Sequence, residues 1–174
     1  GHGVPGALIS LIGYNNLNRC LHELNLREPA KILDEMANLV EKAFEKQGSS
    51  LRDGMDMALC VHDPQTNTLQ FAGANNPLYW VRSGELNEIK GDKQPVGRFD
   101  SRVPYQNHTI DLQSGDHIYI FSDGIPDQFG GDRGKKFKHS NLRKLLLEHY
   151  ASSTTEQKRI IEDTVETWRG DLEQ

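Results

Sequence analysis

The spacing of apolar residues changes close to residue 50, and this change limits the folds that the chain can adopt. Before it, apolar residues recur every three or four positions, which is the period of a helix that buries one face. From Met55 they occur in short runs bounded by turn residues, which indicates strands. Helical spacing returns after residue 140. This order predicts an α+β domain in which helices pack on antiparallel sheet.

The expected elements follow from where each pattern begins and ends. Helices are predicted from Pro5 to Leu24, from Pro29 to a stop at Gly48, and over 141–150 and 155–168, the last one capped at Ser153. The stretch 91–104 is rich in glycine, proline and charge, and favours a mobile flap. Strands are predicted at 57–62, 68–72, 78–82, 86–89, 108–112 and 117–121, with a turn at 113–116.

Composition excludes several classes of function. The 174 residues are 36% apolar and 26% charged with a net charge of −5, which is typical of a soluble globular chain. The negative charge disfavours nucleic acid and an anionic membrane surface as partners, and favours a metal cation. No apolar stretch is long enough to span a membrane and no secretory signal opens the chain. We expect Cys20 and Cys60 to be free thiols and the location to be cytoplasmic.

The segment 117–128 carries the most informative chemistry. An apolar strand pattern delivers Asp123 at its C-terminal end, and Gly124 follows at once. A strand end holds a carboxylate in place, and hard divalent cations bind carboxylate oxygens held in this way. Asp127, four residues further on, either joins the same cation or caps a turn. The alternative is that Asp123 only begins an Asp-Gly turn.

Two other segments contain candidate functional residues. Backbone amides near Gly1 and Gly3 can hold an anion at a helix start, and His2 beside them is placed to donate a proton; the alternative is a glycine-rich cap or a purification remnant. At the end of the predicted strand 68–72, the side-chain amides of Asn75 and Asn76 bind either a ligand or their own backbone. Asp56 lies between Met55 and Met57 in a strand-like run, where its carboxylate needs a partner or a wet cleft.

Five motifs, in order, resemble the SpoIIE-like branch of the metal-dependent (PPM-type, protein phosphatase 2C-like) serine/threonine phosphatases. They are GHGVPGA at 1–7, DGMDMAL at 53–59, AGANNPL at 72–78, KQPVG at 93–97 and FSDGIPDQFGG at 121–131. Each motif is modest alone, but five in the family's order are specific. The resemblance implies a four-layer α-β-β-α sandwich of antiparallel sheets flanked by helices, with a metal cluster at one end of the sheets.

The resemblance also implies a chemistry and a set of site residues. Mn²⁺ or Mg²⁺, two ions in a complete site, activates a water that attacks the phosphorus of phosphoserine or phosphothreonine. By position, Asp123, Gly124 and Asp127 belong to the metal site, and His2 protonates the leaving oxygen. Residues 91–99 resemble the flap beside the cleft. The expected substrate or cleft residues are Gly1, Gly3, Asp56, Asn75 and Asn76.

Two further aspartates of the family's metal site fall outside the sequence, one before GHG and one after the WRGDLEQ segment at 168–174. We therefore expect a single phosphatase domain over 1–174 that is truncated at both termini, lacks edge strands and binds metal weakly alone. The resemblance implies a phosphorylated regulatory protein of the anti-anti-sigma type as substrate, in bacterial signal transduction, and an N-terminal sensor or receiver domain. The alternatives are a non-catalytic module that binds a phosphoprotein and, for the apolar stripe Leu8 to Leu24, a dimer surface rather than core packing.

Overall fold

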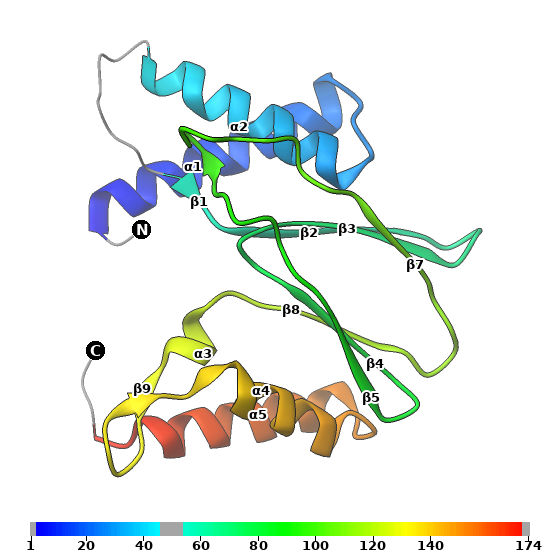
Figure 1. Ribbon diagram of the computed structural model, residues 1–174, viewed down its shortest axis with the longest axis vertical. Helices are drawn as coiled ribbons and strands as arrows, with labels where there is room; N and C mark the ends of the chain where they lie inside the picture. Colours follow the sequence, from blue (N-terminus) through cyan, green and yellow to red (C-terminus); the bar gives the residue numbers. More distant parts are fainter. Residues whose placement is uncertain (1–2, 46–53, 172–174) are drawn as a thin grey trace. The chain divides into compact units, whose positions relative to one another are not determined.

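The computed structural model describes residues 3–45 and 54–171, with side chains described over 6–43 and 54–171 (Figure 1). It contains helices together with antiparallel strands, so the predicted α+β class is confirmed. The chain divides into two compact units, Gly1–Leu78 with Ile89–Gln113 and Tyr79–Glu88 with Ser114–Gln174. Each unit has its own core, and we describe each by itself.

The first unit begins with two helices. The helix α1 (Gly3–Asn18) continues into a π-helical turn, η1 (Arg19–Glu23), and α2 (Pro29–Glu45) follows. Pro29 suits the first position of α2, where a missing amide costs no helical hydrogen bond. The apolar stripe predicted for α2 comprised Ile32, Leu33, Met36, Leu39, Val40 and Phe44. It is confirmed over the described side chains, because the first five are buried and all of these except Val40 belong to a core cluster that includes strand residues. The side chain of Phe44 lies outside the described ones.

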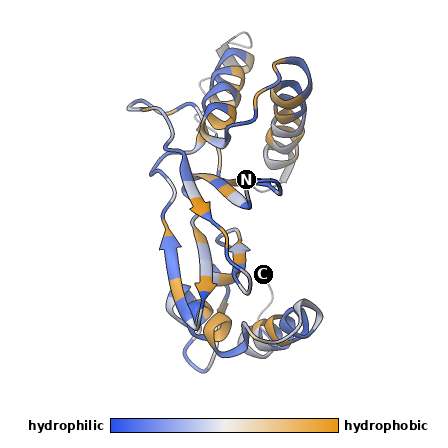
Figure 2. Cartoon of the chain, turned by 90° about the vertical axis from the view of Figure 1, so that its right-hand side faces the viewer, coloured by the Kyte–Doolittle hydropathy of each residue, from blue (hydrophilic) through white to orange (hydrophobic). Residues whose placement is uncertain are grey.

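The sheet of the first unit has the order β2-β3-β7, formed by β2 (Met57–Asp63), β3 (Thr68–Ala74) and β7 (His108–Asp111). Both pairings are antiparallel. A separate pair joins β1 (Gly54–Met55) to β6 (Val96–Gly97). The helix α2 contacts β2, β3 and β6, so the core of this unit lies between helix and strands. Figure 2 shows hydrophobic and hydrophilic residues interspersed along its helices and strands.

The second unit joins a three-stranded sheet to helices. The strand order is β5-β4-β8, with β4 (Leu78–Arg82), β5 (Glu85–Ile89) and β8 (His117–Ile120). A short helix, α3 (Gly124–Asp127), precedes the hairpin of β9 (Phe129–Gly130) and β10 (Lys135–Lys136). Two helices follow, α4 (Lys138–His149) and α5 (Thr154–Arg169). The predicted cap of α5 is confirmed, since the Ser153 hydroxyl accepts from the amide of Glu156 at 3.2 Å.

The structure departs from the sequence-based expectations in several places. The stretch 91–104 is not simply a flap without elements, because it contains β6 and the buried side chain of Gln94. The helix expected from 141 begins at Lys138. The turn at 113–116 connects β7 to β8, but the two strands join different sheets. In addition, α3 and the β9–β10 hairpin lie where no element was predicted. Over the residues that are described, no helix is long and apolar enough to cross a membrane.

Candidate active site

Asp123 lies just beyond the end of β8 and immediately before α3. Its backbone is already helical, with φ −67° and ψ −10°, and its carbonyl accepts a 2.8 Å hydrogen bond from the amide of Asp127. The side chain is exposed. To the residues that the structure describes, the Asp123 carboxylate makes no hydrogen bond or ion pair. Its oxygens are therefore accessible to a ligand from solution.

Asp127, one helical turn further on, has a partner. Its carboxylate forms a 2.7 Å ion pair with the ammonium group of Lys136, and both side chains are about half exposed (48% and 47%). Such an exposed pair contributes little to stability, but it compensates the charge of Asp127. Of the two aspartates, Asp127 within α3 is paired with a lysine, whereas Asp123, which precedes the helix, has no charged partner among the described residues. Asp123 is therefore the more available ligand.

The segment after α3 is tied to the end of α5. The carbonyl of Gln128 accepts two hydrogen bonds, one at 2.8 Å from the amide of Phe137 and one at 3.1 Å from the indole N–H of Trp168. The rings of Phe137 and Trp168 meet edge to face, with 5.5 Å between centroids. These contacts fix the chain that follows Asp123, which limits how far its loop can move.

Aromatic packing supports the other side of the Asp123 loop. Phe121, two residues earlier, packs edge to face on the buried ring of Tyr79 at 4.8 Å. The Tyr79 hydroxyl accepts a 3.1 Å hydrogen bond from Nε of Arg143, and its oxygen lies 3.1 Å from Nδ1 of His139. Burial raises the pKa of Tyr79, and the nearby Arg143 opposes that rise. The phenol therefore stays neutral at physiological pH and acts as a packing and hydrogen-bonding group.

The candidate residues of the first unit meet at the end of β3. The Nδ2 amide of Asn75 donates a 2.7 Å hydrogen bond to the Asp56 carboxylate, so Asp56 has the partner that its position requires. Asn75 adopts a left-handed backbone conformation (φ 60°), and its backbone N–H donates a 2.8 Å hydrogen bond to the carbonyl of Asp92. The turn packs so closely that a Cβ on Gly73 would lie 2.3 Å from the carbonyl oxygen of Asn76.

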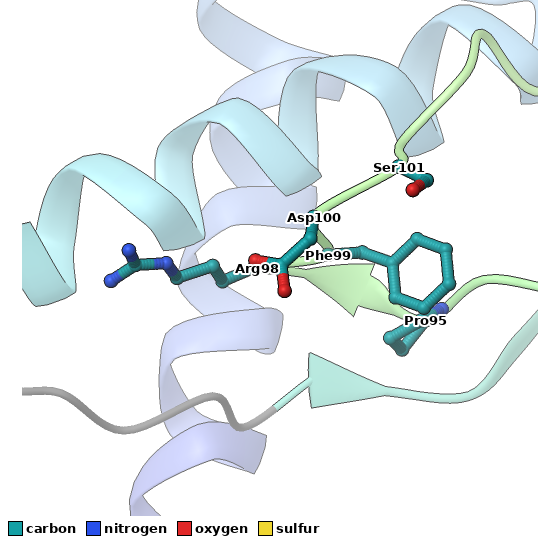
Figure 3. Close-up of a pocket in the computed structure, with 5 residues that line it drawn as sticks. All are labelled: Pro95, Arg98, Phe99, Asp100 and Ser101. Carbon is teal, nitrogen blue, oxygen red and sulfur yellow. The ribbon is translucent and has the colours of Figure 1, made fainter.

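The flap is held at both ends by the side chain of Gln94, which is only 2% exposed. Its Nε2 donates to the carbonyl of Val103 at 2.7 Å, and its Oε1 accepts from the Val103 amide at 3.0 Å. The Tyr105 hydroxyl donates to the carbonyl of Pro95 at 2.9 Å. Between these anchors lies an open recess of about 400 Å³. Figure 3 shows the ring of Phe99 beside Pro95, with Arg98 extending to the opposite side of the loop.

A divalent cation requires more ligands than the described residues bring together. A hard cation takes several oxygen ligands, but no group of three or more His, Cys, Asp or Glu side chains able to hold a metal occurs among the residues described. Asp123 offers one accessible carboxylate, and Asp127 is paired with Lys136. The described part of the chain thus supplies a ligand of suitable chemistry without forming a metal site alone.

The predicted site residues lie in both units. Asp56, Asn75 and Asn76 lie in the first, and Asp123, Gly124 and Asp127 lie in the second. Gly3 begins α1, whereas Gly1 and His2 lie outside the described residues. The roles assigned to all of these residues remain predictions. Sequence reasoning missed the anchors Gln94 and Trp168. Gln94 is distinguished by its burial, and Trp168, which is partly buried, by its hydrogen bond to the Gln128 carbonyl.

The chain is similar to one protein family and to several solved structures. The family model described as Stage II sporulation protein E (SpoIIE) matches residues 1–173. The solved SiaA-PP2C domain of Pseudomonas aeruginosa is 30% identical with a TM-score of 0.88, over 98% of this chain and 66% of that chain. The comparison with curated proteins gave no match.

Two more distant structures share the fold. The PP2C phosphatase domain of SpoIIE from Bacillus subtilis, with a fragment of its regulatory domain, is 15% identical with a TM-score of 0.69, over 98% of this chain and 48% of that one. PppA of P. aeruginosa, described as a regulatory component of T6SS, is 18% identical with a TM-score of 0.65. The match covers 97% of this chain and 76% of that one. The chain therefore spans slightly less than two thirds of the SiaA structure and about half of the SpoIIE structure.

Proposed function

Because this chain belongs to the SpoIIE family, whose solved relatives are phosphatase domains, we propose that it hydrolyses phosphoserine or phosphothreonine on a bacterial regulatory protein. The observation that carries this proposal is the exposed Asp123 carboxylate, which has no partner among the described residues and follows a packed strand. A carboxylate held there is suited to bind a cation rather than to stabilise the fold.

Asp123 is proposed as one ligand of Mn²⁺ or Mg²⁺, with Gly124 and Asp127 at the same site. A bound divalent cation would supply a water with a lowered pKa and would screen the charge of the phosphate. Around it, the chain's own residues have separate tasks. Phe121 and the Gln128 carbonyl hold the loop from its two sides, and His2 is the proposed proton donor to the leaving serine oxygen.

The residues of the first unit are proposed to line the substrate cleft. Asn75 and Asp56 form a hydrogen-bonded pair at the surface, and Gly1, Gly3 and Asn76 complete the expected cleft set. The proposed substrate is of the anti-anti-sigma type, and the proposed upstream partner is an N-terminal sensor or receiver domain. We place the protein in the cytoplasm, and we expect neither nucleic acid nor direct membrane contact.

The test is phosphate release from a phosphoserine protein, with and without Mn²⁺, for the wild-type chain and Asp123→Asn. Asp163→Asn is the matched control, since it removes an exposed carboxylate from α5 of the same unit. Turnover that depends on Mn²⁺, disappears in Asp123→Asn and persists in Asp163→Asn is expected. Equal activity of the two variants would refute the role of Asp123.

A non-catalytic module that binds a phosphoprotein is the second candidate. It is favoured by one observation, namely that the described residues contain no group of three metal-ligating side chains. Under this alternative, the chain binds the phosphoprotein with the same affinity in EDTA and in Mn²⁺ and releases no phosphate. Binding and turnover measured on the same preparation distinguish the two candidates.

A further inference from the structure

The hairpin that follows α3 concentrates positive charge in an acidic chain. Within residues 129–138, which we call the basic hairpin, lie four cationic side chains and a single acidic one, Asp132. The whole chain, by contrast, carries a net charge of −5. All four cationic residues are exposed, and they are Arg133, Lys135, Lys136 and Lys138. Such a cluster produces a local positive potential that attracts an anionic partner.

The cations of the basic hairpin differ from the others of the second unit in their pairing. In the described part of this unit, every lysine and arginine outside the hairpin has a carboxylate partner. Inside the hairpin only Lys136 has one, Asp127; Arg133, Lys135 and Lys138 form no ion pair with a described residue. The pairs outside are Arg82–Asp116, Arg143–Glu88, Lys144–Glu148, Lys158–Glu162, Arg159 with Glu156 and Asp163, and Arg169–Glu166. Among the described residues, three cationic charges of the hairpin thus have no carboxylate partner and are accessible to an external one.

The basic hairpin is rigidly mounted, which lowers the entropy cost of binding. The Gly131 amide donates a 2.6 Å hydrogen bond to the carbonyl of Trp168 at the end of α5, and the two strands pair Gly130 with Lys135. The Gly134 amide closes the turn on the Gly131 carbonyl at 3.0 Å. Figure 1 shows β9 lying beside the end of α5. The cations are therefore presented on a fixed turn.

An exposed aromatic ring adds an apolar contact to this surface. Phe129, at the base of the hairpin, is 50% exposed, and the ammonium group of Lys136 lies 5.9 Å from its ring centroid. A surface that combines unpaired cations with an exposed ring fits an acidic peptide segment containing an apolar side chain. The hairpin also follows directly on α3, which the exposed Asp123 precedes.

We propose that the basic hairpin docks an acidic segment of the phosphoprotein substrate. The identity of the partner as the substrate rests on the proposed function, whereas its acidic character rests on the unpaired cations. A protein segment is favoured over nucleic acid because the hairpin cations without an ion pair to a described residue number three and lie within six residues. The paired helices beside them offer no continuous basic track along which a polyphosphate backbone could lie.

The test measures binding by fluorescence anisotropy in EDTA, which keeps the phosphate on the probe. The probes are two fluorescein-labelled phosphoserine peptides, one flanked by glutamates and a leucine and one flanked by lysines and a leucine. The variant is the double substitution Arg133→Ala with Lys135→Ala. The matched control is Lys144→Ala with Lys158→Ala, which removes the same charge from paired positions on α4 and α5 of the same unit.

We expect the acidic peptide to bind more tightly than the basic one. At about 0.15 M salt, the hairpin variant is expected to bind the acidic peptide about fivefold more weakly than wild type. The affinity of the control variant for this peptide is expected to change less than about twofold. Thermal midpoints verify that both variants fold, and charge reversal (Arg133→Glu with Lys135→Glu) is expected to weaken binding further. Equal losses in hairpin variant and control overturn the proposal, as does tighter, hairpin-dependent binding of single-stranded oligothymidylate.

Hydrolysis of para-nitrophenyl phosphate by the same proteins distinguishes the two proposals. Turnover that is equal in wild type and hairpin variant, together with hairpin-dependent binding, supports both. Hairpin-dependent binding without any turnover contradicts the proposed hydrolysis and leaves the hairpin as a docking surface for an acidic phosphoprotein segment. Turnover with hairpin-independent binding contradicts the docking role only.

Discussion

The carbonyl oxygen of Trp168 occupies the place where a side chain at residue 130 would begin: a Cβ on Gly130 would lie 1.8 Å from it. The next amide, that of Gly131, donates a 2.6 Å hydrogen bond to the same oxygen. The end of α5 and the hairpin that follows the Asp123 loop are therefore in direct backbone contact. This contact makes α5 the support of the loop.

Replacing Gly130 with alanine is expected to destabilise the protein by about 2–4 kcal/mol, because a backbone atom cannot move aside as a side chain can. The urea midpoint of the purified chain measures this. Gly134→Asn is the control, since residue 134 has open space around it and a φ of 53° that asparagine tolerates. An equal loss in both variants would show that hairpin conformation, rather than the contact with Trp168, sets the cost.

Asn75 combines a left-handed backbone with a hydrogen bond to Asp56. Asn75→Gly retains the backbone freedom and loses the hydrogen bond, whereas Asn75→Ala loses both. We expect the alanine variant to be less stable than the glycine variant by about 1 kcal/mol, which is the cost of a Cβ at positive φ. Thermal unfolding compares the two. If they are equally stable, the left-handed conformation at this turn does not constrain the residue.

Arg102 links the flap to α2. Its guanidinium donates a 2.6 Å hydrogen bond to Oδ1 of Asn38 and lies 3.5 Å from the Glu41 carboxylate. Arg102→Ala is expected to cost about 1 kcal/mol and to speed amide hydrogen exchange over 94–104. Arg98→Ala, an exposed position on the same flap, is the control and should leave exchange unchanged. Exchange that is equally fast in both variants would exclude Arg102 as an anchor.

Burial raises the pKa of the Cys60 thiol to about 11. The thiolate is the reactive form, so alkylation by iodoacetamide should be slow at pH 8 and rise about tenfold per pH unit until about 11. An unfolded chain releases this proton near its ordinary value of 9.0. Wild type should therefore lose stability relative to Cys60→Ala as pH rises from about 9 to 11. Measuring alkylation in the Cys20→Ala variant isolates the reaction of Cys60. An alkylation rate that stops rising below pH 9 would contradict the raised pKa of Cys60.

Much of the fold was predictable from local pattern. Three features follow from residues that are close together in the sequence. They are the apolar stripe of α2, the hairpin of β2 and β3, and the cap at Ser153. Family membership, inferred from five motifs in order, is confirmed. The roles of Asp123 and His2 stay predictions, because a metal or proton-transfer role depends on groups that no local pattern brings together.

The sequence by itself predicted the longer helices and strands, because hydrophobic period and capping act over a few residues. It did not predict α3 or the β9–β10 hairpin. Only the tertiary structure decided that β7 and β8, separated by a short turn, join different sheets. It also decided that Trp168 anchors the loop after Asp123 through Gln128. Such contacts join residues far apart in the chain, and whether they form depends on how complete elements pack. The charges of the basic hairpin are visible in the sequence. Only the structure shows that Arg133, Lys135 and Lys138 have no carboxylate partner among the described residues, whereas Lys136 has one.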